Sequence, residues 1–168
     1  MGYYKQLEGE LMELVLDEAT KKDIDELIRM RLSYMMDLHG EMSEDEAERI
    51  EKQLKSYFKR KLGTELIAFV AREGICIVSV AYLHIIEMPA NLSVIDGVYG
   101  EVLSVYTMPK YRGRGLCSRL MYSLVEYSKE HGLNLIDLAA TEDGYPIYKK
   151  LGFKIKEPIY TDMRYVIS

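Results

Sequence analysis

Residues 103–118 read LSVYTMPKYRGRGLCS, and this stretch carries more structural information than any other part of the chain. It predicts a strand that ends before Pro109, a turn that contains Gly113 and Gly115, and then the start of a helix. The first turn of a helix has unpaired backbone N–H groups with partial positive charge, and glycines let an anion approach them closely. Arg112 and Arg114 add fixed positive charge. The stretch therefore indicates an anion site with room for a pyrophosphate.

Two well-defined phosphate-binding motifs do not match this stretch. It lacks the G-x-x-x-x-G-K-[ST] pattern of a P-loop and the third glycine of a dinucleotide-binding fingerprint. An RGRG sequence also occurs as an ordinary basic turn. The bare pattern therefore leaves two interpretations open, an anion site and a solvated turn.

The residues before this stretch predict two helices. Thr20 and Asp23 form a candidate cap for the first, which is expected to end near Gly40. Ser43 and Glu46 form a capping box for the second, in which apolar residues recur every four positions. The charges on the other face of the second helix are of both signs, which is typical of a solvated helix surface.

Alternation of apolar residues and turn signals place the remaining elements. In chain order we expect strands at 11–16, 66–71, 75–86, 99–108, 133–140, 153–155 and 163–167, with helices at 20–40, 43–63, 115–132 and 146–152. The order is β-α-α-β-β-β-α-β-α-β-β. We see no internal repeat and no linker, so residues 1–168 are expected to form one domain.

Composition narrows the class of protein. The 168 residues carry a formal net charge of −5 and are 48% apolar, which is typical of one soluble globular domain. No run is long and apolar enough to span a membrane, and residues 1–10 do not resemble a signal peptide, so we expect a cytoplasmic protein without a membrane partner. Cys76 and Cys117 predict reduced thiols and no metal site. The acidic balance argues against nucleic acid as a partner and slightly favours cationic substrates.

Two segments together resemble the GNAT superfamily of N-acetyltransferases. They are residues 105–117 and residues 145–153, which read YPIYKKLGF. Arg112, Gly115 and Cys117 occupy the places of the superfamily signature Arg/Gln-x-x-Gly-x-Gly/Ala, with Cys117 as a departure at the last place. The resemblance covers about residues 99–156. It implies a mixed α/β fold with a central, mostly antiparallel sheet, helices on both faces, and acetyl-CoA as cosubstrate without a metal.

The resemblance also implies where acetyl-CoA binds. Strand 103–107 would splay from strand 133–140, and the pantetheine arm would bond to backbone groups between them. The amides of 112–117 and the Ser118 hydroxyl would hold the pyrophosphate. We expect cofactor contacts at Val105, Tyr106, Thr107, Arg112, Gly113, Arg114, Gly115, Leu116, Cys117, Ser118, Thr141 and Tyr148. Thr141 replaces an Asn that the superfamily often has seven residues before its motif tyrosine.

Two residues are candidates for catalysis. Tyr148 stands at the tyrosine of the superfamily's Tyr-x-x-x-Gly-Phe motif, which implies contact with the CoA sulfur. An unperturbed tyrosine has a pKa of about 10 and a thiol about 8.5, so a hydrogen bond to the departing thiolate is more plausible than full proton transfer. Glu101 is the candidate base for the amine, with Asp96 as its rival and a water chain as the alternative. Cys117 as a catalytic nucleophile is a less favoured alternative.

The connection between the first two helices often borders the acceptor site in this superfamily. It contains Asp37, His39 and Glu41, an acidic rim that would suit a cationic amine; ordinary loop polarity is the other explanation.

We therefore expect acetyl transfer from acetyl-CoA to a primary amine by direct attack in a ternary complex. The acceptor is either a small molecule or a protein N-terminus or lysine. One alternative is a CoA-binding sensor or regulator that has lost turnover; another is a nucleotide-binding module that prefers ATP. The resemblance also implies a homodimer in which the last strands make contact.

Overall fold

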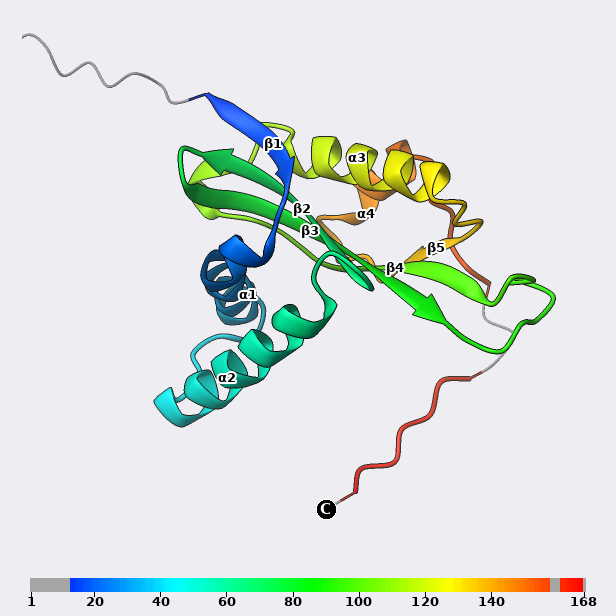
Figure 1. The fold of residues 1–168 in the computed structure, drawn as a ribbon, viewed down its shortest axis with the longest axis horizontal. Helices are drawn as coiled ribbons and strands as arrows, with labels where there is room; N and C mark the ends of the chain where they lie inside the picture. The colour runs from blue at the N-terminus through cyan, green and yellow to red at the C-terminus, as the bar shows by residue number, and fades with distance from the viewer. Residues whose placement is uncertain (1–12, 158–160, 168) are drawn as a thin grey trace, which may run out of the picture.

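The computed structural model describes residues 13–157 and 161–167, which form one five-stranded sheet with helices on both faces (Figure 1). The sheet order follows the sequence, β1-β2-β3-β4-β5, and the pairs are antiparallel except for the parallel β4–β5 pair. The elements are β1 Leu14–Glu18, η1 Lys21–Asp23, α1 Ile24–His39, α2 Glu44–Lys61, β2 Leu66–Glu73, β3 Cys76–Glu87, β4 Val98–Thr107, η2 Pro109–Tyr111, α3 Leu116–Glu130, β5 Ile136–Leu138 and α4 Tyr145–Lys150.

Both predicted capping boxes are formed. The Thr20 amide donates to Asp23 Oδ2 at 2.7 Å, and the Ser43 amide donates to Glu46 Oε2 at 2.9 Å. The first box caps a single 3-10 turn, η1, and α1 continues from Ile24. Because both helix starts are fixed locally, α1 and α2 can pack their apolar sides on the same face of the sheet, while α3 covers the other face (Figure 1).

The sheet separates two apolar clusters. Alternate residues of β2 and β3 face opposite sides, so Val70 and Val80 pack with α1 and α2, whereas Ala71 and Ala81 pack with α3. On the first side the rings of Phe58 and Tyr82 stack with their centroids 5.8 Å apart. Each fully buried leucine or phenylalanine contributes about 2 kcal/mol, so these two clusters dominate the stability of the fold.

Some predicted strand boundaries were wrong. β1 begins at Leu14 and runs to Glu18, whereas residues 11 and 12 of the expected strand lie outside the described residues. β5 covers only Ile136–Leu138 of the expected 133–140. The hairpin turn also moves, because Arg72 and Glu73 stay paired with β3 and the chain turns at Gly74.

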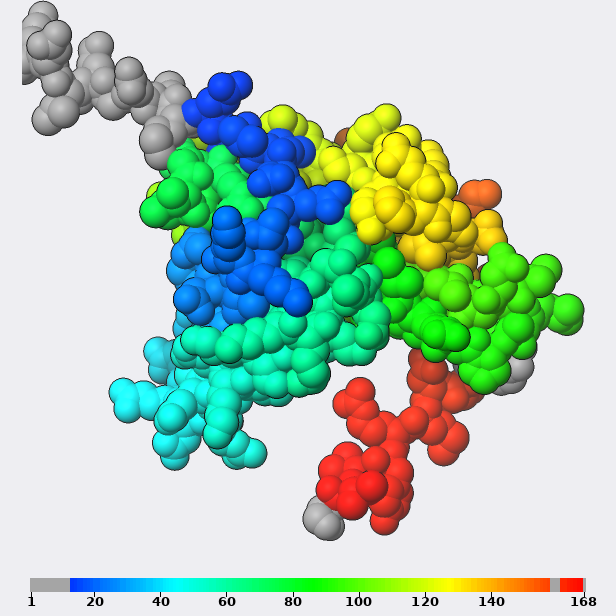
Figure 2. Space-filling model, in the orientation of Figure 1, coloured from blue at the N-terminus to red at the C-terminus, as the bar shows by residue number. Residues whose placement is uncertain are grey.

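The last two predicted strands, 153–155 and 163–167, are not formed in the part of the chain that the structure describes. A strand needs a neighbour for its backbone hydrogen bonds, and β5, the last strand of the sheet, pairs only with β4. Residues 161–167 stand clear of the sheet and helices in Figure 2, and their apolar side chains are exposed, with Met163 at 94% and Ile167 at 89%. The homodimer that these strands implied stays a prediction.

No helix in residues 13–157 or 161–167 is both long and apolar enough to cross a membrane.

Gly97 closes the connection from β3 to β4, and its conformation gives a test of the fold. It has a φ of 68°, and a Cβ added there would lie 2.5 Å from the carbonyl oxygen of Met88. We expect Gly97→Ala to lower the free energy of unfolding by about 2 kcal/mol, because the Met88 amide donates a 2.8 Å hydrogen bond to the Gly97 carbonyl and so holds Met88 against this position. Equilibrium denaturation in urea measures this loss.

Gly63→Ala is the matched control. Gly63 has a φ of 82° with nothing within 4 Å of an added Cβ, so this variant bears only the left-handed conformational penalty, about 1 kcal/mol. Equal losses at the two glycines would contradict the close approach to Met88.

Candidate functional site

The two parallel strands part in the middle of β4. The ladder joins Gly100–Val102 to Ile136–Leu138 and stops there, whereas β4 continues to Thr107. Along residues 103–107 the edge of β4 that faced β5 has no strand beside it. The splay expected from the sequence is thus present, and it leaves backbone N–H and C=O groups open to a ligand.

A β-bulge lies at the same place. Val80 pairs with Tyr106 and Tyr82 with Leu103, so Ser104 and Val105 both stand opposite one residue of β3. Ser104 has a φ of 47° and is the only described residue other than glycine with a positive φ. A left-handed serine costs roughly 1 kcal/mol, and such strain is common where a bulge redirects the backbone beside a binding site.

The loop after β4 presents the start of α3. Gly113 and Gly115 have φ values of 76° and 72°, and nothing lies within 4 Å of a Cβ added at either position. Gly115 is the N-cap of α3 and provides no side chain to cap the first turn. The loop residues 112–115 are exposed, so the first amides of this 15-residue helix face open space. This arrangement fits a phosphate-bearing group.

Two of the predicted contacts in this region can act only through their backbones. The Leu116 side chain is buried in the cluster under α3, and the Tyr106 side chain is buried under α1. Cys117 and Ser118 are half-buried in the first turn of α3. The Thr107 hydroxyl lies 2.7 Å from the Ser79 hydroxyl, inside the β3–β4 pair.

Arg112 ties the loop to α1. Its Nε donates to the Thr107 carbonyl at 3.0 Å, and its Nη2 donates to Asp37 Oδ2 at 2.6 Å. The same carboxylate oxygen accepts a 3.1 Å hydrogen bond from the Tyr106 hydroxyl. Burial and this bond to Asp37 raise the pKa of Tyr106, which keeps its hydroxyl a donor. Asp37, expected in an acidic rim, therefore lies on α1 with its charge already paired.

Tyr148 is held in the interior by α4. Its side chain is 9% exposed, and its ring meets Phe153 edge-on with centroids 6.1 Å apart. A Cβ added at Gly144 would lie 2.8 Å from the Tyr148 ring, so glycine is required there for close approach. Thr141 is exposed, and its hydroxyl oxygen accepts a 3.2 Å bond from the Gly144 amide. Thr141 thus helps to position the start of α4.

Groups from three helices set the pKa of Tyr148. Burial, and after it Cys117 of α3 and Tyr34 of α1 as neighbouring acidic groups, together raise the pKa of Tyr148 to about 12. The tyrosine is therefore a persistent hydrogen-bond donor. Burial also raises the pKa of the Cys117 thiol, which disfavours the thiolate that a nucleophile would need.

Glu101 lies inside β4. The sequence predicted it near the start of this strand. It is half-buried, and the register sets it opposite His84 on β3 and Asp137 on β5. Asp96, its rival, is exposed and accepts a 3.1 Å bond from Asn134 Nδ2. His39 and Glu41 are exposed at the end of α1.

Sequence reasoning missed Arg31 and Tyr34. The Arg31 Nη1 donates to the Ser104 hydroxyl at the bulge, and its guanidinium carbon lies 5.3 Å from the centroid of the Tyr34 ring. The Tyr34 ring in turn meets Tyr106 edge-on at 6.0 Å. Arg31, Tyr34 and Asp37 recur every three residues along one side of α1, a signal that gains meaning only once α1 is known to lie against β4.

Comparisons with known proteins agree with this geometry. Residues 32–153 match the acetyltransferase (GNAT) family. A solved structure of a predicted acetyltransferase with acetyl-CoA from Clostridium acetobutylicum is 29% identical, with a TM-score of 0.79 over 90% of this chain and 96% of that one. A GCN5-related N-acetyltransferase from Ralstonia eutropha JMP134 shares the fold, with a TM-score of 0.74 at 21% identity over 90% and 99% of the two chains.

A curated relative matches over a shorter segment. The glucosamine 6-phosphate N-acetyltransferase of Trypanosoma brucei brucei is 38% identical over 58 residues, which are 34% of this chain and 40% of that protein. The match thus spans less than half the length of that relative. The family match, by contrast, covers most of this chain and includes β4, the glycine loop, α3 and α4. This chain belongs to the acetyltransferase (GNAT) family.

Proposed function

We propose that the protein transfers the acetyl group of acetyl-CoA to a primary amine by direct attack in a ternary complex. The observation that carries the proposal is the convergence of three features at one place. They are the open edge of β4, the uncapped start of α3 and the hydroxyl of Tyr148, whose side chain is otherwise buried. The neighbour from Clostridium acetobutylicum was solved with acetyl-CoA, and the Trypanosoma relative is named for an amine substrate, which supports both halves of the proposal.

The residues present fit acetyl-CoA. Gly113 and Gly115 leave open space in front of the first amides of α3, as a pyrophosphate requires, and the β4 edge offers backbone groups at Val105 and Thr107. The Thr107 carbonyl already accepts a hydrogen bond from Arg112, so we expect the other backbone groups of the β4 edge to make most of the hydrogen bonds to acetyl-CoA. When bound, acetyl-CoA supplies the thioester that carries the acetyl group.

Each residue then has a defined task. A β4 amide near the bulge stabilises negative charge on the carbonyl oxygen. Tyr148 donates a hydrogen bond to the sulfur as charge develops there. Its pKa of about 12 makes it a donor that keeps its own proton until charge has built up, because the thiol is the stronger acid. Glu101 accepts the proton of the amine, directly or through water.

A CoA-binding sensor without turnover is the rival function, and one experiment separates the two. Calorimetry with acetyl-CoA, CoA and ATP tests the cofactor, and an amine panel then tests turnover. Micromolar binding of acetyl-CoA without ATP binding, followed by acetylated product, supports the enzyme. Binding with no product from any amine indicates the sensor, and preference for ATP would contradict both.

The Tyr148 hydroxyl is tested by Tyr148→Phe. We expect kcat to fall about 10- to 100-fold, because the variant loses a hydrogen bond to a charged sulfur, while the Kd for acetyl-CoA changes little. Steady-state kinetics and calorimetry measure the two quantities. Tyr145→Phe is the control, since Tyr145 lies exposed on the same helix. A Tyr148→Phe enzyme with unchanged kcat contradicts the assignment.

Glu101 is tested by Glu101→Gln. We expect kcat/KM at pH 7 to fall about 100-fold and the deficit to shrink as the pH approaches the pKa of the amine, about 10, because a neutral amine needs no base. Asp96→Asn is the matched control and should behave like the unmodified protein. If the two variants lose the same activity, Glu101 is not the base.

The raised pKa of Tyr148 gives a pH prediction. A hydroxyl with a pKa of about 12 stays protonated throughout the range in which an ordinary tyrosine, at about 10, would ionise. We therefore expect kcat to rise with pH as the amine deprotonates and to show no alkaline fall up to pH about 10. A fall centred below pH 10 that disappears in Tyr148→Phe would show that the hydroxyl ionises earlier.

A further inference from the structure

Arg31 differs from the other arginines that pack against the sheet. Arg29 pairs with Glu26 at 2.8 Å, Arg72 with Asp23 at 2.9 Å, and Arg112 with Asp37. Among the residues that the structure describes, no carboxylate oxygen lies within the 4.0 Å of an ion pair from the Arg31 guanidinium. Arg31 is half-buried, and its partners are neutral, the Ser104 hydroxyl and the face of the Tyr34 ring.

A charge that is partly removed from water without a counter-ion lowers stability, and a ligand that supplies the opposite charge offsets that cost. The position of Arg31 indicates where such a ligand would bind. It contacts Ser104, one residue from Val105 on the open edge of β4, and Tyr34 lies between it and the Tyr106–Asp37 pair. Arg31 therefore borders the side of β4 on which α1 packs.

The neighbouring surface of α2 is also positive. Burial raises the pKa of the half-buried Tyr57 and Glu65 raises it further, whereas the cations Lys61, Arg31 and Arg60 lower it. Lys61 is paired with Glu65, so Arg31 and Arg60 are the cations of this group that form no ion pair with another described residue.

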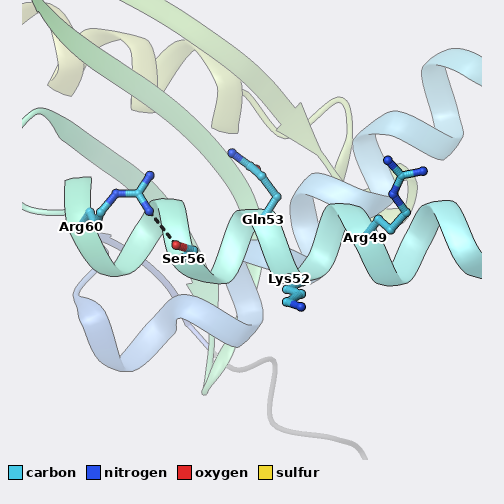
Figure 3. Close-up of a pocket in the computed structure, with 5 residues that line it drawn as sticks. All are labelled: Arg49, Lys52, Gln53, Ser56 and Arg60. Atoms are coloured by element: carbon cyan, nitrogen blue, oxygen red, sulfur yellow. Dashed lines mark hydrogen bonds between the residues drawn. The ribbon is translucent and has the colours of Figure 1, made fainter.

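Arg60 also lines a shallow hollow of about 380 Å³, together with Arg49, Lys52, Gln53 and Ser56. Arg49, Gln53 and Arg60 rise from one side of α2, and the Arg60 Nη1 donates to Ser56 Oγ at 2.6 Å (Figure 3). No carboxylate lines this hollow. The acid expected to attract a cationic amine, Asp37, is neutralised by Arg112. An anionic group is thus the complement of this surface.

We propose that Arg31 binds an anionic group of the acceptor, so that the substrates are amines carrying a carboxylate or a phosphate a few bonds from the nitrogen. The proposal rests on the proposed acetyl transfer and names its substrate class. A guanidinium suits both anions, because its parallel N–H donors match two oxygens of either group. The Ser104 hydroxyl and the Tyr34 ring hold that fork in place at the bulge.

Matched pairs of amines test the substrate class. Glucosamine 6-phosphate with glucosamine, and 4-aminobutanoate with 4-aminobutanamide, differ only in the anion. We expect kcat/KM to be at least about 10-fold higher for the anionic member of one pair, because a charged hydrogen bond contributes roughly 1.5–3 kcal/mol. The phosphate pair and the carboxylate pair identify the source of the anion. Equal kcat/KM within both pairs overturns the proposal.

Variants then test Arg31 itself. Arg31→Gln should lower kcat/KM for the preferred anionic amine about 10- to 100-fold and leave its neutral partner within about 3-fold, and Arg31→Lys should recover part of the loss. Lys22→Gln is the control, since it removes one charge from an exposed position in η1. Equal losses on both members of a pair would show that Arg31 only supports the bulge, which overturns the proposal.

A binding measurement separates this proposal from the proposed function. Calorimetry of the preferred anionic amine is made with the unmodified protein and with Arg31→Gln, with and without CoA. Binding that weakens about 10-fold or more in Arg31→Gln supports the anion site even if acetyl-CoA does not bind, an outcome that would overturn acetyl transfer alone. No binding of either anionic amine to the unmodified protein overturns the anion site.

Discussion

From Leu103 to Thr107, β4 runs with a strand on one side only. Its partner on the other side ends at Leu138, and the bulge at Ser104 turns the backbone just beyond that point. The backbone N–H and C=O groups of an unpaired strand edge must form hydrogen bonds with water, another chain or a ligand. The glycine loop and α3 follow this edge directly, so the parting of two strands places an open edge and an open helix start next to each other.

Three helices complete the site from different directions. α3 contributes its first turn, α4 contributes the Tyr148 hydroxyl, and α1 contributes Arg31, Tyr34 and Asp37. The contacts of Arg112 show how closely the parts are coupled. One guanidinium joins the loop, the last residue of β4 and the last turns of α1, so the glycine loop and α1 are held in one arrangement.

Local charge around the site differs from the charge of the whole chain. The formal net charge is −5, which slightly favours a cationic substrate. Around α1 and the end of α2, however, three carboxylates are matched to particular bases: Asp37 to Arg112, Glu26 to Arg29 and Glu65 to Lys61. Beside the bulge of β4, the charge that has no ion-pair partner among the described residues is that of Arg31. Recognition depends on charges within a few ångströms, because more distant exposed charges are screened by salt.

The sequence by itself determined most of the elements and the glycine turn that precedes α3. Capping boxes at Thr20 and Ser43, apolar periodicity and the glycine turn act between residues close in the chain, so they can be recognised without a structure. The residues of the motif around Tyr148 are also close together in the chain, so they could be recognised in the same way.

Only the tertiary structure decided the length of β5, the lack of a strand in residues 153–157 and 161–167, and the contacts of Arg31, Asp37 and Glu101. Strand pairing and ion pairing join residues far apart in sequence. Arg31 and Ser104 are 73 positions apart, and Asp37 and Arg112 are 75 apart, distances over which no periodic pattern carries information. Which charges neutralise one another, and which remain for a ligand, follows from packing alone.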